Sequence, residues 1–200
     1  MGYFVPGMIK HIFSILLFLA GSSAYAQFTV SIHWQRASTG NTGDTIYYDR
    51  ERLLDWEDFK GIPVENSLAA AITESGFGYR MAMNSFNGRM NVNITVQCYF
   101  NKRKSWVKTG MNSDYALTHE QHHFDITYIN TCLFIQKLRA AKFTQENYTS
   151  LVNKIHDECY NALEKMQDDY DGQTMNGRSR RMQANWNKKI DRELESLVIN

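Results

Sequence analysis

Residues 117–123 read Leu-Thr-His-Glu-Gln-His-His and contain the pattern H-E-x-x-H, the strongest indication of chemistry in this chain. On a helix, the first and fifth positions of the pattern lie one turn apart on the same face. His119 and His123 can therefore bind one metal ion together, with Glu120 placed to act on a metal-bound water. Because the pattern is short, the alternative is a surface helix that carries three histidines. The metal interpretation requires a helix beside a cleft and a third ligand from elsewhere in the chain.

The residue types in the pattern predict a catalytic zinc site. Such a site has three protein ligands and one open position for water, whose pKa the ion lowers toward neutrality. His119 and His123 would supply two ligands. Glu120 cannot easily bind the same ion, so we predict it as the general base that passes the water's proton to the leaving amine. His122 does not share a helix face with this pair, and we expect it to point to the sheet or to solvent.

Three helices are predicted after Gly110, where the hydrophobic pattern changes to a helical period. Asn112 or Ser113 can cap the first, which runs to about Ala141. A second helix follows a cap at Thr144 and ends near Tyr170, before Gly172, and a third follows Gly177 and reaches Leu197. The apolar stripe of the first helix lies on a different face from the metal pattern and comprises Leu117, Phe124, Tyr128, Ile135 and Leu138.

The sequence before Gly110 alternates as β-strands do. Strands are expected over 28–34 and 45–48, and a hairpin over 72–83 and 90–100 with Asn87-Gly88 at its turn. Val92, Ile94, Val96 and Cys98 fall on one face of the last strand, which we expect to be buried. The fold class is therefore predicted as α+β, with an antiparallel sheet followed by the metal-binding helix and two further long helices.

The first 26 residues have the features of a signal peptide. A thin basic region at Lys10 and His11 precedes the apolar stretch 12–20, and Ala24 and Ala26 form the small-x-small pattern of a cleavage site. The apolar stretch is too short for a comfortable membrane span, and no later segment approaches about 20 apolar residues. An uncleaved N-terminal anchor is the alternative. We expect cleavage after Ala26 and a soluble protein that is secreted or periplasmic.

Charge gives no reason to expect a nucleic-acid partner. Lys10 is the one Lys or Arg among the first 26 residues, so cleavage of the signal peptide leaves 21 Lys+Arg against 21 Asp+Glu. This balance lacks the positive charge that binds phosphates. The basic cluster at 178–181 is expected to be the solvated start of a helix. Residues 27–200 are enough for one domain with a real core. The oligomeric state cannot be inferred.

Three cysteines leave at least one thiol unpaired. Cys98 lies in a strand-like stretch, and Cys132 and Cys159 lie in helical stretches. If the two helices form an antiparallel hairpin, Cys132 and Cys159 could approach each other. The alternative is that all three are small buried hydrophobic residues.

Short motifs between about Leu54 and Leu197 occur in an order and spacing that together are fairly specific. They are Leu54-Asp55-Trp56-Glu57-Asp58-Phe59, Ala69-Ala70-Ala71, Ser105-Trp106, the stretch 117–126, Tyr170-Asp171-x-x-Thr174, Gln183 and Trp186. Through these motifs, the chain resembles a family of bacterial secreted proteins grouped as a domain of unknown function and predicted to be zinc-dependent proteases of the zincin type. The resemblance implies a zincin-like fold, in which a sheet edge lies along the cleft and can pair with a substrate strand.

The third ligand is the point at which this chain departs from the family, whose downstream motif usually reads Tyr-Asp-x-x-Thr-x-His-Gly. Asn176 stands where that histidine would be. If the histidine is the third ligand, this chain has lost it, since an asparagine oxygen binds zinc poorly. If the aspartate is the ligand, Asp171 is present, and we favour this alternative because a carboxylate is an ordinary partner for two histidines. Other acids that could serve are Glu158, Glu164 and Asp169, while Tyr170 could contact a developing oxyanion or simply pack.

Two functions follow from these expectations. The first is an exported zinc-dependent metallopeptidase that hydrolyses peptide bonds in a peptide or protein substrate, with Glu120 as general base. The second is a binding protein of the cell envelope on a zincin fold, with a weak or inactive site. The sequence does not reveal the substrate or the cleavage specificity.

Overall fold

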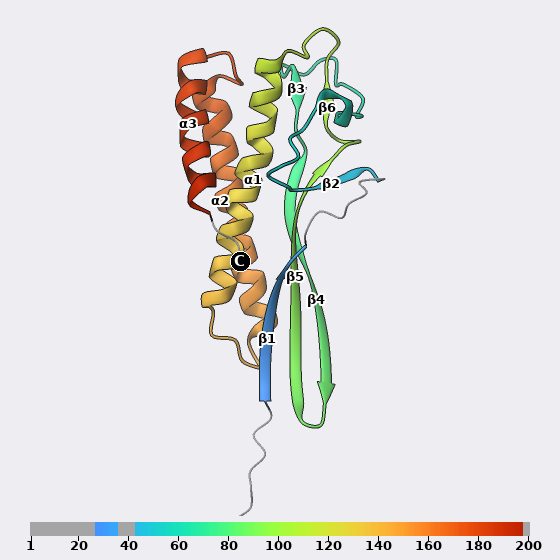
Figure 1. Cartoon of the computed structure of the whole chain (residues 1–200), viewed down its shortest axis with the longest axis vertical. Helices are drawn as coiled ribbons and strands as arrows, with labels where there is room; N and C mark the ends of the chain where they lie inside the picture. Colours follow the sequence, from blue (N-terminus) through green and yellow to red (C-terminus); the bar gives the residue numbers. More distant parts are fainter. Residues whose placement is uncertain (1–26, 36–42, 198–200) are drawn as a thin grey trace, which may run out of the picture.

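The computed structural model describes residues 27–35 and 43–197. In this part of the chain, a four-stranded sheet carries three long helices on one face, and a small two-stranded sheet lies at one end (Figure 1). The α+β class is therefore confirmed. The predicted signal peptide, residues 1–26, lies outside the described residues. None of the described helices is long and apolar enough to span a bilayer.

The larger sheet is built around β5 (Arg89–Asn101). The whole of β4 (Ser75–Phe86) pairs with one edge of β5 in antiparallel orientation. The other edge of β5 is shared by β1 (Gln27–Trp34) and β2 (Thr45–Tyr47). β2 is antiparallel to β5, but β1 is parallel to it. The prediction of an antiparallel sheet was wrong for β1. Alternation fixes the face that each side chain takes, but it does not fix the direction in which a strand runs.

The predicted hairpin is present, with Asn87 and Gly88 at φ 48° and 72° in the turn. Its first strand, β4, is as long as expected but begins at Ser75 and ends at Phe86, because the chain from Ala71 to Phe86 divides into two strands. β3 (Ala71–Ile72) turns away from the large sheet and pairs with β6 (Trp106–Val107). Between β2 and β3, η1 (Trp56–Asp58) forms a single 3-10 turn.

Three helices follow the sheet, as expected, with differences at their ends. α1 (Asp114–Ala140) begins at Ser113, whose hydroxyl accepts a hydrogen bond from the backbone N–H of Ala116 at 3.2 Å. α2 (Tyr148–Thr174) begins after Asn147 rather than at Thr144, and α3 spans Arg180–Ser196.

The end of α2 differs from the prediction in a way that matters for the site. The helix continues through Gly172, because one glycine lowers helix stability without ending a helix that is packed against its neighbours. The chain leaves the helix only at Met175, Asn176 and Gly177, all with positive φ. Asp171 is therefore a helical residue.

The core lies between the sheet and the helices, with α1 against β4 and β5 and with α2 and α3 beyond it (Figure 1). The predicted inward face of β5, residues Val92, Ile94, Val96 and Cys98, is fully buried. A second apolar cluster around Phe100 and Phe124 anchors the half of α1 that carries the metal pattern. All three cysteines are buried free thiols, so the possible bond between Cys132 and Cys159 is not formed.

Candidate metal centre

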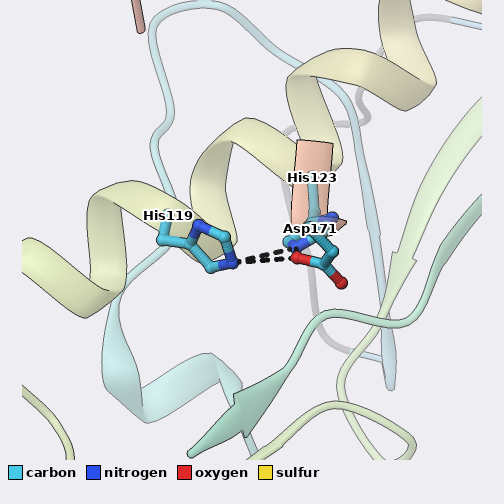
Figure 2. A group of neighbouring side chains, drawn as sticks. All are labelled: His119, His123 and Asp171. Atoms are coloured by element: carbon cyan, nitrogen blue, oxygen red, sulfur yellow. Dashed lines mark hydrogen bonds and ion pairs between the residues drawn. The ribbon is translucent and has the colours of Figure 1, made fainter. Parts of the chain in front are cut away.

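The H-E-x-x-H pattern lies on α1, and α2 places a carboxylate opposite it. His119 and His123 lie one turn apart on α1, and Asp171 projects toward them from the last turns of α2 (Figure 2). One oxygen of Asp171, Oδ1, lies 3.2 Å from His119 Nε2 and 3.1 Å from His123 Nε2. The two Nε2 atoms are 3.3 Å apart. The three predicted ligand residues thus come together in a group that could hold a metal ion.

The spacing of these three atoms fits a small tetrahedral cation. Zinc binds histidine nitrogen and carboxylate oxygen at about 2.1 Å, so two ligands of a tetrahedral zinc lie about 3.4 Å apart. The observed separations of 3.1–3.3 Å are close to this value. Two imidazoles and one carboxylate also form an ordinary donor set for a catalytic zinc. The residues present therefore fit this metal.

The protonation of the group favours a carboxylate at Asp171. Burial acts to raise the pKa of Asp171, but hydrogen bonds from His119 and His123 outweigh it and hold the pKa well below its usual range. Burial alone would lower the pKa of His123. The hydrogen bond to Asp171 and the charge of Glu120 outweigh burial, so the pKa of His123 is raised. A raised pKa means that protons compete more strongly with a metal for His123, so metal binding should weaken as the pH falls.

Glu120 is buried in the wall of the same site. Its side chain lines a cavity of about 650 Å³ together with His119, His123 and Asp171. Glu120 is only 5% exposed, and none of the described residues forms a hydrogen bond with its Oε2 atom. A buried carboxylate oxygen without a protein partner is costly, and such groups are typical of functional sites. The arrangement therefore combines three convergent ligand atoms with an adjacent group that can accept a proton.

Comparisons with protein-family models, with curated proteins and with solved structures found no match. The functional argument therefore rests on the geometry of the site.

The other candidate ligands lie elsewhere. Glu158 pairs with Lys137, and Asp169 pairs with Lys165 on the surface of α2. Glu164 and Asn176 line the cavity, and Glu164 is not one of the acids and histidines that form the ligand group. Asn176, where the family that this chain resembles carries a histidine, is thus at the cavity, whereas Asp171 belongs to the group that could hold a metal.

The remaining residues singled out in the sequence have structural roles. His122 is buried and forms a hydrogen bond to Asp125 at 3.0 Å, away from the ligand pair. The Tyr170 hydroxyl donates to the backbone carbonyl of His119 and accepts from Gln183, so it is not free to contact an oxyanion. Tyr170 instead packs its ring against the His119 ring, with 4.7 Å between the ring centroids.

Two glutamines complete the site and were not predicted as functional. Gln183 Oε1 lies 2.8 Å from His119 Nδ1, and Gln167 Oε1 lies 2.6 Å from His123 Nδ1. Gln183 appeared only among the residues that carry the resemblance. Gln167 could have been noticed because it lies four residues before Asp171 and so shares its helix face. An uncharged amide, however, carries no signature of its own in a sequence.

Proposed function

We propose that this chain is an exported zinc-dependent metallopeptidase of the zincin type, in which His119, His123 and Asp171 bind zinc. The observation that carries the proposal is the buried Glu120 carboxylate, which lines the same cavity as the three convergent ligands and has an oxygen without a partner among the described residues. When bound, zinc supplies a Lewis acid that polarises a carbonyl group and makes a water molecule acidic.

Glu120 then acts as the general base. Its carboxylate takes a proton from the attacking water and returns it to the amine that leaves when the peptide bond breaks. The base is held in place from two sides, since Glu120 lies on α1 and its backbone carbonyl accepts a hydrogen bond from the Thr73 hydroxyl at 3.1 Å. Burial of Glu120 keeps this proton transfer in a region of low dielectric.

The substrate is proposed to be a peptide or protein in extended conformation. Residues 69–73, which include β3, line the cavity. β3 pairs on one side with β6, and none of the described strands pairs with its other edge, where the proposed substrate strand would be added. Main-chain hydrogen bonds to that edge would lay a peptide across the cavity beside Glu120. The family resemblance would likewise imply a sheet edge along the cleft.

Export is the part of the proposal that rests on sequence alone, namely on the signal-peptide features of residues 1–26. The zincin assignment rests on the order of the elements, a sheet followed by a helix that carries H-E-x-x-H, with the third ligand on the next helix. Proteolysis outside the cytoplasm is consistent with both features.

Glu120→Gln provides the test. Purified protein should contain about one zinc per chain and cleave members of a peptide library, whereas the Glu120→Gln variant should keep zinc and fold but lose cleavage. Glu164→Gln is the matched control, because Glu164 lines the same cavity but is not in the ligand group. Zinc binding without any cleavage that depends on Glu120 would refute the peptidase and favour the binding protein.

A further inference from the structure

The hydrogen bonds around His119 define which of its ring nitrogens carries the proton. The backbone carbonyl of His119 can only accept a hydrogen bond, so the Tyr170 hydroxyl, 3.2 Å away, donates to it. The oxygen of that hydroxyl is then the acceptor for Gln183 Nε2 at 2.6 Å. The same amide nitrogen donates to Asn187 Oδ1 at 2.7 Å. The amide oxygen of Gln183 therefore faces His119 Nδ1, which must donate to it.

The same reasoning applies to His123, where Gln167 alone takes the place of Tyr170 and Gln183. Gln167 Nε2 lies 2.9 Å from the backbone carbonyl of His123, which again can only accept. The NH₂ group of Gln167 is thus turned toward that carbonyl. Its amide oxygen is left facing His123 Nδ1 at 2.6 Å, and this nitrogen must carry the proton.

Each ring is therefore linked by hydrogen bonds to the backbone carbonyl of its own residue. The link of His123 runs through the Gln167 amide, and that of His119 runs through the Gln183 amide and the Tyr170 hydroxyl. Gln183 is only 1% exposed, so water does not compete for its hydrogen bonds. With Nδ1 protonated on both rings, each Nε2 faces Asp171 Oδ1 with either a proton that it donates to the carboxylate or, in the neutral imidazole, a lone pair. Three lone pairs that converge within 3.3 Å repel one another and favour a cation.

We propose that Gln167 and Gln183 are positioning residues, which fix both imidazoles in the Nδ1–H tautomer and so prepare their Nε2 atoms to bind the metal. The proposal rests on the zinc site of the proposed function. Neither glutamine needs to touch the ion or the substrate. Outer partners of this kind orient the ligands of metal sites, and their loss typically lowers metal affinity about 10–100-fold.

The first test observes the tautomers directly in protein labelled with ¹⁵N-histidine. Long-range ¹H–¹⁵N correlations distinguish Nδ1–H from Nε2–H rings, and the zinc-free protein is measured at a pH at which both rings are neutral. We expect the Nδ1–H pattern for His119 and His123. In Gln167→Met, the pattern of His123 should become mixed while that of His119 stays unchanged. Gln167→Glu should keep the Nδ1–H pattern, because a carboxylate oxygen still accepts from Nδ1.

The second test measures zinc affinity by competition with a chromogenic chelator. Gln167→Met should bind zinc about 10–100-fold more weakly than the unmodified protein, whereas Gln167→Glu should retain the affinity. Gln167 is only partly buried, so its variants should fold even if the equivalent change at the buried Gln183 does not. Gln173→Met is the matched control, since Gln173 is also on α2 and accepts an aromatic N–H, from Trp186 at 3.1 Å.

The outcomes separate this proposal from the proposed function. Nε2–H rings in the unmodified protein, or unchanged tautomer and affinity in Gln167→Met, would overturn the positioning role. Zinc bound tightly without peptide cleavage would refute the peptidase and leave the positioning role supported. Equal losses of affinity in Gln167→Met and Gln173→Met would show a general effect on α2 and would also overturn the positioning role.

Discussion

The Nε2 atoms of His119 and His123 lie 3.3 Å apart, with the planes of the two rings at 89° to each other. Two nitrogens this close need a shared cation or proton between them and their common neighbour, the Asp171 carboxylate. The i,i+4 spacing on α1 creates this proximity, and the opposing helix α2 supplies the negative charge.

His123→Ala should lower zinc affinity at least about tenfold, because it removes one of three direct ligands. The double variant of His119 and His123 should abolish stoichiometric binding. Zinc content after dialysis, measured by atomic emission, checks both. His156→Ala serves as the control, since His156 is a partly exposed histidine outside the ligand group. Equal zinc content in the double variant and the unmodified protein would remove the metal assignment.

The third ligand can be tested at two positions on either side of the end of α2. Asp171→Ala should reduce zinc affinity at least about tenfold, because the carboxylate oxygen lies within 3.2 Å of both ring nitrogens. Asn176→His introduces the histidine of the family that this chain resembles but should change zinc affinity little, because we propose Asp171 as the third ligand. A sharp gain of affinity in Asn176→His, with little loss in Asp171→Ala, would assign the ligand position to residue 176.

The sequence predicted α1 well, because every signal for this helix is local. The change of period after Gly110, the cap at Ser113 and the i,i+4 histidines all act within one helix. The hairpin turn at Asn87-Gly88 was equally predictable, since both residues tolerate positive φ.

The parts that the sequence missed depend on contacts between distant segments. β1 pairs in parallel with β5, and no pattern within either strand encodes that direction. The choice of Asp171 over Glu158 or Glu164 follows from how α2 faces α1. Gln167 and His123 are opposite each other for the same reason. The sequence could suggest acidic candidates, but only the packing of the two helices selects among them.

Acid should destabilise the protein in part through Asp58, which is 3% exposed and paired with Arg52 and Lys102 at 2.8 and 2.9 Å. Burial acts to raise the pKa of Asp58, but hydrogen bonds from Arg52 and Lys102 outweigh it and lower the pKa. For a lowered pKa, the stabilisation is complete above the unfolded value, about 3.9, and is lost as the pH falls through the folded value.

Asp58→Asn should therefore lower the free energy of unfolding at pH 7 and flatten its decline between about pH 4 and pH 2. We expect the free energy of unfolding to fall by roughly 3 kcal/mol at neutral pH. This value is near the lower end of the costs of breaking a buried ion pair, because the Arg52 side chain is 33% exposed. Urea unfolding at several pH values measures both effects. Asp169→Asn breaks an exposed pair with Lys165 and should cost less than about 1 kcal/mol. Identical pH profiles for Asp58→Asn and the unmodified protein would contradict the assignment.

The turn after α2 should be sensitive to side chains at Gly177, for two separable reasons. Gly177 has φ 75°, which costs an L-residue about 1–2 kcal/mol, and a Cβ atom there would already lie 3.4 Å from the His119 ring. Gly177→Val should therefore destabilise the protein and also displace His119. Gly88→Val has the same backbone cost at φ 72°, but a Cβ atom at Gly88 has no heavy atom within 4 Å. We expect similar losses of stability in both variants and weaker zinc binding only in Gly177→Val, measured by urea unfolding and chelator competition. Equal zinc affinity in the two variants would show that the turn does not support His119.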